Sequence, residues 1–233
     1  MAGLPKDSNH LIELLPRRER LSLLARCQHA ELVLASVLAE AGQPTRHAYF
    51  PVAGFICLVS LSKGHPDLEV GMVGAEGLLG APLFLGAVKS PLRALVQGQG
   101  GAWRIGRKDF LAELALSAPL RSVVGRYLHV LMAQLTTSAT CMRFHEIGPR
   151  LARWLLMSQD RAHADRFGVT HEFLAYMLGV RRVGITAAAG VLQDAGLIQY
   201  RRGALTVLNR RGLQAAACGC YTTDSANYRE LLS

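Results

Sequence analysis

Between residues 170 and 211, hydrophobic positions recur with the spacing of two short helices followed by two strands. Apolar side chains share one face of each predicted helix: Leu174, Ala175 and Leu178 on the first, and Ile185, Ala188 and Leu192 on the second. Gly179 stands between them, where a sharp turn favours a residue without a Cβ. Gly196 closes the second helix, and residues 198–208 alternate as two strands around a tight turn. The pattern predicts a helix-turn-helix with a β-hairpin wing.

The first half of the chain shows two other patterns. Residues 9–40 carry leucines and valines three and four residues apart, which predicts helix, with Pro16 starting a second piece. From Gly42 to Ile105, short runs rich in β-forming residues alternate with Gly and Pro turns: 48–51, 55–61, 68–73, 92–97 and 101–105. Such spacing is typical of a small antiparallel roll or barrel. Residues 107–116 and 118–144 return to helix.

The helix predicted over 118–144 is long for a small domain. Apolar residues on it alternate four and three positions apart: Leu120, Val124, Tyr127 and Leu131, followed by the weaker members Gln134, Ser138 and Cys141. This spacing predicts a seam against an identical helix, and hence a parallel homodimer. The alternative is that the same face covers the roll, and both arrangements can hold together.

The dipeptide Gly148-Pro149 interrupts the pattern, and a new helix begins near Arg150. We therefore expect an α+β chain in three parts. A sensor β-roll with flanking helices spans 1–117, a dimerisation helix spans 118–145, and a winged helix-turn-helix spans 146–233.

Charge supports a nucleic-acid partner for the last part. The chain has a formal net charge of +9, and residues 143–233 hold 12 arginines against 7 acids. A basic domain favours an anionic partner, and double-stranded DNA is the one that suits a helix-turn-helix. No apolar run approaches the roughly 20 residues that span a bilayer, and no signal-peptide pattern opens the chain. We expect a cytoplasmic protein without a membrane partner.

In combination, a β-roll, a long helix and a C-terminal winged helix resemble the superfamily of the cyclic AMP receptor protein and the fumarate–nitrate reduction regulator (CRP/FNR). The resemblance is strongest over Thr170–Ile198, and Tyr49–Gly54 and Val70–Gly77 are similar to the family's roll turns. It implies a transcription regulator in which a signal at a cyclic-nucleotide-binding-like roll reorients paired DNA-binding domains. It also implies RNA polymerase as a partner.

The cyclic-nucleotide cassette of that family is altered here. The family has Gly-Glu-hydrophobic-Gly, whose Glu binds the ribose hydroxyl, and then Arg-Ser-Ala, whose Arg pairs with the cyclic phosphate. This chain has Gly-Leu-Leu-Gly at 77–80, and Leu78 cannot accept a hydrogen bond. Lys89 and Arg93 are the remaining phosphate candidates, but neither stands at the motif position. We therefore expect no cyclic AMP or cyclic GMP binding, no cofactor, and an effector that the sequence does not identify.

The resemblance places DNA contact at the start of the second helix. Base contacts are predicted from five residues: Arg181, Arg182, Val183, Thr186 and Ala187. Arg182 matches a base-reading arginine of the family, whereas Val183 and Ala187 replace a glutamate and an arginine that read cytosine and guanine. Valine and alanine can touch only a thymine methyl, so the half-site should differ from the family's common one. Phosphate contacts are predicted from Thr170, His171, Arg201 and Arg202.

The five cysteines are scattered and odd in number, which argues against a disulfide framework. Cys218 and Cys220 form the one close pair, and without a nearby histidine they lack the usual zinc spacing. We expect reduced thiols and no metal site, with a redox role as the open alternative. No grouping of a nucleophile with a base stands out, so no catalytic residues are predicted. The rival hypothesis is a small-ligand-binding protein or enzyme whose winged helix contacts proteins.

Overall fold

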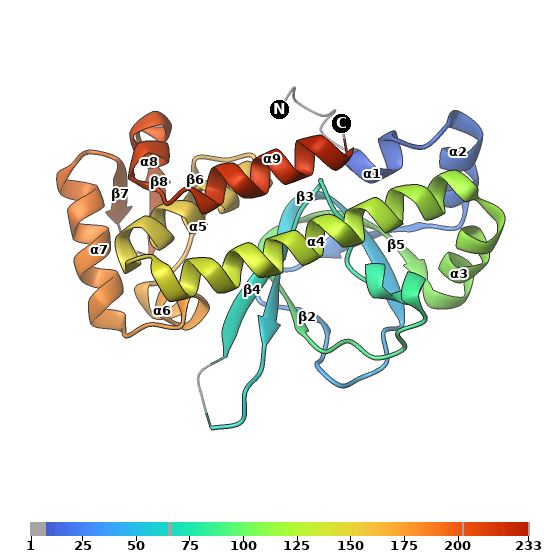
Figure 1. Ribbon diagram of the computed structural model, residues 1–233, viewed down its shortest axis with the longest axis horizontal. Helices are drawn as coiled ribbons and strands as arrows, with labels where there is room; N and C mark the ends of the chain where they lie inside the picture. Colours follow the sequence, from blue (N-terminus) through green and yellow to red (C-terminus); the bar gives the residue numbers. More distant parts are fainter. Residues whose placement is uncertain (1–7, 65–66, 202, 233) are drawn as a thin grey trace.

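The computed structural model describes residues 8–64, 67–201 and 203–232 (Figure 1). Two short helices, α1 (His10–Glu13) and α2 (Arg17–Ala25), precede the sheet. Asn9 caps α1 by accepting from the backbone N–H of Leu11 at 3.0 Å. Its side-chain amide donates to the carbonyls of Pro51 and Gly77, at 2.9 and 2.8 Å. One buried asparagine therefore both starts the helix and fixes it to the roll.

The roll is an antiparallel sheet with the strand order β1-β5-β3-β4, and β2 also pairs with β5. Its elements are β1 (Gln28–Leu32), β2 (Val37–Ala39), β3 (His47–Ser60), β4 (Leu68–Val73), the 3-10 helix η1 (Ala81–Leu85) and β5 (Arg93–Gly106). The pairing of β3 with β5 shifts register around Ala53–Ile56. Gly54 lies there at φ 74°, and a Cβ on it would lie 2.3 Å from the Gly98 carbonyl oxygen. Only glycine allows the two strands to bend so closely together.

The five predicted β runs are confirmed, with two of them joined in β3 and two in β5. The helix predicted over 9–40 is wrong beyond Ala25, because β1 and β2 occupy 28–32 and 37–39. The leucine and valine spacing there does not bury one helical face. Leu32 is fully buried against the sheet, whereas Val33 and Leu34 are exposed. Pairing of β1 with β5, from Gln28 opposite Arg104 onward, outweighs the local helical pattern.

Helix α3 (Arg107–Leu116) leads into α4 (Ala118–Phe144), which crosses the roll as one continuous helix, as predicted. Ser117 caps α4, and its hydroxyl accepts from the Leu120 N–H at 3.2 Å. On the roll side, the Gln134 side-chain oxygen accepts from the Met72 N–H at 3.2 Å. Gln134 is therefore a buried polar anchor on the roll.

The seam predicted on α4 faces the roll of its own chain. Leu120, Val124 and Tyr127 are 2%, 0% and 3% exposed and belong to the core that contains Phe50 and Phe110. Leu131 is half-buried against the same core. Leu120, Val124 and Tyr127 are therefore not available to a second chain, and the alternative that this face covers the roll is correct. The hydrophobic spacing marked a buried face and did not distinguish which neighbour buries it.

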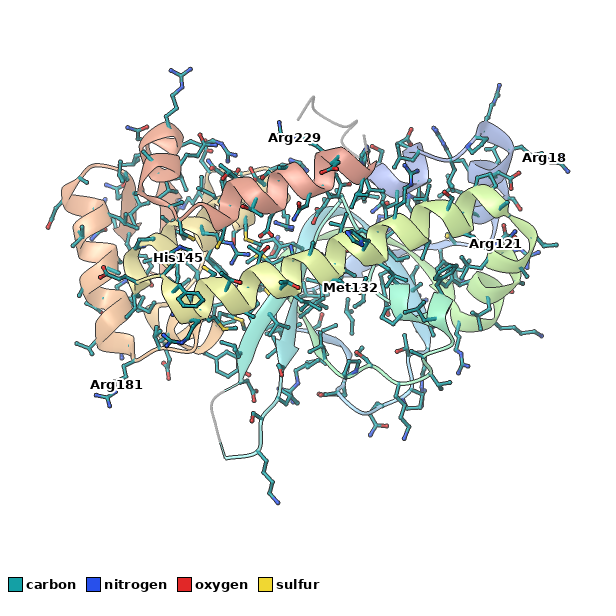
Figure 2. The ribbon with its side chains drawn as sticks, viewed as in Figure 1. Arg18, Arg121, Met132, His145, Arg181 and Arg229 are labelled. Atoms are coloured by element: carbon teal, nitrogen blue, oxygen red, sulfur yellow. The ribbon has the colours of Figure 1, made fainter. Side chains whose placement is uncertain are left out.

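A second stripe on α4, one residue further along, is only partly covered by its own chain. We call it the open face; its members are Gly125, Leu128, Met132, Leu135, Ala139 and Met142. They also follow a four-three spacing, and Met132 is 58% exposed. Figure 2 labels Met132 near the middle of α4.

After α4 the chain forms the predicted winged helix-turn-helix. It contains α5 (Ile147–Ala162), β6 (Arg166–Gly168), α6 (His171–Leu178), α7 (Arg182–Asp194), β7 (Ile198–Arg201), β8 (Ala204–Val207) and α8 (Arg210–Ala216). The three strands form a separate antiparallel sheet with the order β6-β8-β7. Among the described residues no single helix is long and apolar enough to cross a membrane. Only α6 and α7 taken together pass such a test, and they bend by 110°.

The last helix, α9 (Cys220–Leu232), runs back along α4 toward α1 (Figure 1). Leu232 is fully buried in the same core as Leu11. The Tyr228 hydroxyl donates to the Glu76 carbonyl at 2.7 Å and lies 2.6 Å from the His10 Nδ1. Helix α9 therefore connects the end of the winged helix to the N-terminal half of the chain.

The winged helix also packs directly on the roll. The Trp154 indole N–H on α5 donates to Glu69 on β4 at 3.1 Å, and the Tyr176 hydroxyl on α6 donates to Asp67. Residues of β3 and β4 share one hydrophobic core with α5, α6 and α7. The two halves thus form a continuous packed unit.

Candidate nucleic-acid interface

The turn between α6 and α7 has the geometry that the sequence predicted. Thr170 caps α6, its hydroxyl accepting from the Phe173 N–H at 3.1 Å. Gly179 ends α6 in the left-handed region at φ 62°. Ile185 and Ala189 are buried, whereas Ala188, predicted to be buried, is only half-covered. Packing of these small and branched side chains fixes α7 against α5 and α6.

The start of α7 projects into solvent. All five predicted base-contacting residues are exposed: Arg181, Arg182, Val183, Thr186 and Ala187. Val183 is 72% exposed. Within the described part of the chain, neither Arg181 nor Arg182 forms an ion pair. Figure 2 shows Arg181 extending away from the body of the molecule. The positive charges at this end of α7 are therefore free to meet an anion.

His171 joins the two helices to the wing. Its Nδ1 lies 3.1 Å from the Thr186 hydroxyl, and its ring stacks on Tyr200 with centroids 4.4 Å apart. Burial, and then the charge of Arg182, lower the pKa of His171, which favours the neutral ring. The Thr186 hydroxyl in turn donates to the Arg182 carbonyl at 3.1 Å. His171 therefore links the start of α7 to the wing, and its predicted phosphate contact stays a prediction.

The remaining phosphate candidates lie on either side of α7. Thr170 is exposed at the start of α6, and Arg201 is exposed at the end of β7. Arg202 lies outside the described residues. The structure adds Arg166, an exposed residue on β6, which sequence reasoning missed because β6 joins the wing only through its pairing with β8. Arg210 does not add free charge, since it pairs with Asp160 at 2.6 Å.

The two effector candidates lie in different surroundings. Arg93 pairs with Glu40 at 2.9 Å and lies 3.7 Å from Asp67, so carboxylates already balance its charge. Lys89 is exposed. Leu78 is 1% exposed and belongs to the apolar core under α4. The position that carries the family's ribose-binding glutamate is therefore a core residue here.

One constellation was missed entirely. The expectation that Cys218 and Cys220 have no nearby histidine is wrong, because the fold brings Cys141 and His145 beside them. Cys141 and His145 are four residues apart at the end of α4, and that i, i+4 spacing was the signal available in the sequence.

Comparison with known proteins agrees with this architecture. Residues 149–216 match the Crp-like helix-turn-helix domain. No curated protein sequence matches the chain.

Solved structures share the fold over most of the chain. FixK2 from Bradyrhizobium japonicum aligns with a TM-score of 0.69 and 12% identity, covering 82% of this chain and 98% of its own. A transcriptional regulator of the CRP family from Thermus thermophilus gives 0.67 and 17%, covering 82% and 96%. The c-di-GMP responsive global regulator CLP from Xanthomonas campestris gives 0.66 and 18%, covering 82% and 99%. The roll, the long helix and the winged helix are thus arranged as in these solved structures, which confirms the fold that the resemblance implies.

Proposed function

We propose that this chain, with a CRP/FNR-type fold and a Crp-like helix-turn-helix domain, is a dimeric sequence-specific transcription regulator rather than an enzyme. One observation carries the proposal: two adjacent arginines at the start of α7 are exposed and form no ion pair with any described residue, on a helix whose opposite face is buried. A cytoplasmic location and a contact with RNA polymerase accompany this function.

In the proposed complex the start of α7 enters the major groove. Arg181, Arg182 and Thr186 supply the polar contacts to bases, and Val183 and Ala187 meet thymine methyl groups. Thr170, at the start of α6, presents backbone N–H groups and a hydroxyl to a phosphate. Arg201 on the wing meets a second phosphate. Contacts of the first kind specify the sequence, and those of the second kind position the protein on it.

Dimerisation is proposed through the open face of α4. Its members have the four-three spacing of a coiled-coil seam, with small residues at Gly125 and Ala139 that let two helices approach closely. Exposed apolar side chains such as Met132 and Leu135 would be covered by the same residues of a second copy. A two-fold interface of this kind pairs the two winged helices and calls for a palindromic site.

The test is recovery of bound DNA fragments across a genome, followed by binding measurements on the recovered sequence. We expect a palindrome whose half-sites are about one helical turn apart. Binding should weaken steeply with salt, because arginines displace counterions from phosphates. A matched control is the double variant Arg181→Ala with Arg182→Ala, which should recover no common sequence. Wild-type protein that recovers no sequence above background, or none with two-fold symmetry, would contradict the proposal.

A further inference from the structure

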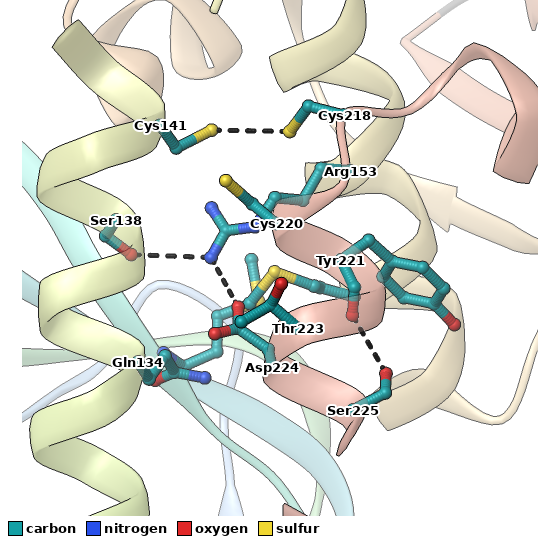
Figure 3. A network of polar contacts seen from close by, with 12 residues as sticks. Gln134, Ser138, Cys141, Arg153, Cys218, Cys220, Tyr221, Thr223, Asp224 and Ser225 are labelled. Carbon is teal, nitrogen blue, oxygen red and sulfur yellow. Dashed lines mark hydrogen bonds and ion pairs between the residues drawn. The ribbon is translucent and has the colours of Figure 1, made fainter. Parts of the chain in front are cut away.

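Four side chains with soft or borderline metal-binding atoms converge between the end of α4 and the start of α9. They are Cys141, His145, Cys218 and Cys220, and one donor atom from each lies within 4.8 Å of the others. All three thiols are free and buried, and His145 is half-buried. Figure 2 labels His145 at the end of α4, and Figure 3 shows Cys141 facing Cys218 with Cys220 below them.

Two distances between donor atoms of the cluster match the edges of a tetrahedron around a small ion. Zinc binds thiolate sulfur at about 2.3 Å and imidazole nitrogen at about 2.0–2.1 Å, which gives tetrahedral edges of about 3.7 Å between sulfurs and about 3.5 Å between sulfur and nitrogen. Cys141 Sγ lies 3.5 Å from Cys218 Sγ, and Cys220 Sγ lies 3.6 Å from His145 Nδ1. The two measured edges therefore agree with the expected ones to a few tenths of an ångström.

Two arginines lie beside the cluster, and one of them, Arg153, is also paired with Asp224. Three thiolates and a neutral imidazole around a divalent ion leave one net negative charge. Arg153 lies close to the thiols, 9% exposed, and its guanidinium bonds Asp224 at 2.6 Å and Ser138 at 3.4 Å (Figure 3). Arg150, on the same helix, lines the same small pocket as Cys141 and Arg153.

We propose that Cys141, His145, Cys218 and Cys220 bind one divalent, thiophilic transition metal, with Zn²⁺ as the type ion, in a closed tetrahedral Cys3His site. Each thiol loses its proton to solvent on binding, and no redox step is involved. Four protein ligands leave no open position, which is the arrangement of structural rather than catalytic zinc.

A metal bound at this site would connect two parts of the fold that are far apart in the sequence. The match to the Crp-like helix-turn-helix domain ends at residue 216, just before Cys218. The metal therefore joins the chain after that domain to the end of α4, and fixes α9 where it starts. Arg150, beside the cluster, donates to the Leu178 carbonyl at the end of α6. The inference does not depend on DNA binding.

The first experiment titrates metal-stripped, reduced full-length protein with Co²⁺ and follows the visible and near-ultraviolet absorption. We expect saturation at one ion per chain, with the strong d–d bands of a tetrahedral site and thiolate charge-transfer bands. Zn²⁺ should then displace the cobalt and abolish these bands. Saturation without charge-transfer bands, or the absence of saturable binding, would overturn the proposal.

Variants locate the site. Cys220→Ser and His145→Gln should each lower affinity by more than the roughly 10- to 100-fold that loss of an outer-shell partner causes. The matched control is Cys27→Ser, a half-buried cysteine in a different core cluster, which should bind as wild type does. His145→Gln alters a half-buried ligand and carries the test if Cys220→Ser does not fold. Equal affinity in wild type and His145→Gln would refute the assignment, as would recovery of a Cys141–Cys218 disulfide from protein that takes up no metal.

Discussion

Arg161 Nε lies 2.8 Å from Glu76 Oε1, and this ion pair joins the first helix of the winged helix-turn-helix to the roll. Both side chains are mostly withdrawn from water, at 12% and 17% exposure. Burial penalises each charge separately, so the pair is stable only while both partners are present. The pair therefore makes the contact between the two halves of the chain sensitive to a single change.

Replacement of Glu76 by Gln tests this dependence. The substitution keeps the shape of the side chain but removes the carboxylate that pairs with the buried Arg161 charge. We expect the free energy of unfolding, measured in urea, to fall by about 3 kcal/mol. Glu40→Gln is the matched control, because the Glu40–Arg93 pair is 47% and 31% exposed and should change stability by less than about 1 kcal/mol. Equal decreases in the free energy of unfolding of the two variants would show that the buried pair contributes no more to stability than the exposed one.

Glu69 predicts a pH dependence at the same junction. Burial raises its pKa to about 7, although Trp154 donates a hydrogen bond to its carboxylate. A carboxyl group whose folded pKa exceeds its unfolded value of 4.5 favours the protonated form in the fold. Its contribution is therefore fully present below pH 4.5 and declines by roughly 1.4 kcal/mol per unit until about pH 7. Glu69→Gln should remove this slope and be the more stable protein at pH 8. Parallel stability curves from urea denaturation across pH 4.5–8 would contradict the prediction.

A single charged substitution tests whether the open face of α4 forms the dimer interface. Met132→Glu introduces a carboxylate in the middle of the proposed seam, and we expect it to give monomers where the wild type is a dimer. Sedimentation at micromolar concentration measures the difference. Leu116→Glu, at a 76% exposed position ending α3, is the control and should leave the dimer intact. A Met132→Glu protein that still sediments as a dimer would place the interface elsewhere.

Substitutions at two arginines should distinguish contacts to bases from contacts to phosphates. Arg182→Ala should weaken binding to the true site by about 1–3 kcal/mol and relax the preference at one base pair per half-site. Arg201→Ala should weaken binding to all sequences alike and reduce the salt slope by about one unit. Titrations on matched and scrambled duplexes at several salt concentrations distinguish the two. If both variants behave like phosphate mutants, Arg182 does not read a base.

Cyclic AMP and cyclic GMP should leave the melting temperature unchanged. A ligand that binds the folded protein raises that temperature in proportion to the logarithm of its concentration. Leu78 offers no acceptor for a ribose hydroxyl and is packed in the core. A buried hydroxyl left unpaired costs about 1–3 kcal/mol. A melting temperature that climbs with nucleotide concentration would refute the prediction and direct attention to Lys89 and Arg93.

Local patterns predicted the winged helix well, because its elements depend on neighbours close in sequence. Gly179 ends α6 in the left-handed region, and α7 begins three residues later, as the spacing required. The β-roll was also predictable, since Gly and Pro turns separate its strands. The residues 28–39 were not, because their strands form only through pairing with residues far along the chain.

The α4 seam and the cysteine cluster were beyond local reasoning for a related cause. Periodicity identifies a helix face that is buried, but the sequence does not state whether the roll or a second chain buries it. Cys141 and Cys218 lie 77 residues apart and meet only because α9 turns back along α4. In both cases the local sequence does not show which distant residues will pack against the segment.

The return of α9 has a mechanical consequence. A DNA-binding module attached only through the junction of α4 and α5 would swing about one hinge. Here α9 makes a second connection across that hinge. Cys218, just before α9, lies beside Cys141 on α4, and Tyr228, in the last turns of α9, contacts the Glu76 carbonyl and His10. Two connections between the winged helix and the N-terminal half restrict their relative motion more than one connection does. The winged helix can therefore rotate only if α1 and the adjoining part of the roll move with it, or if the contacts of Tyr228 near the end of α9 break first.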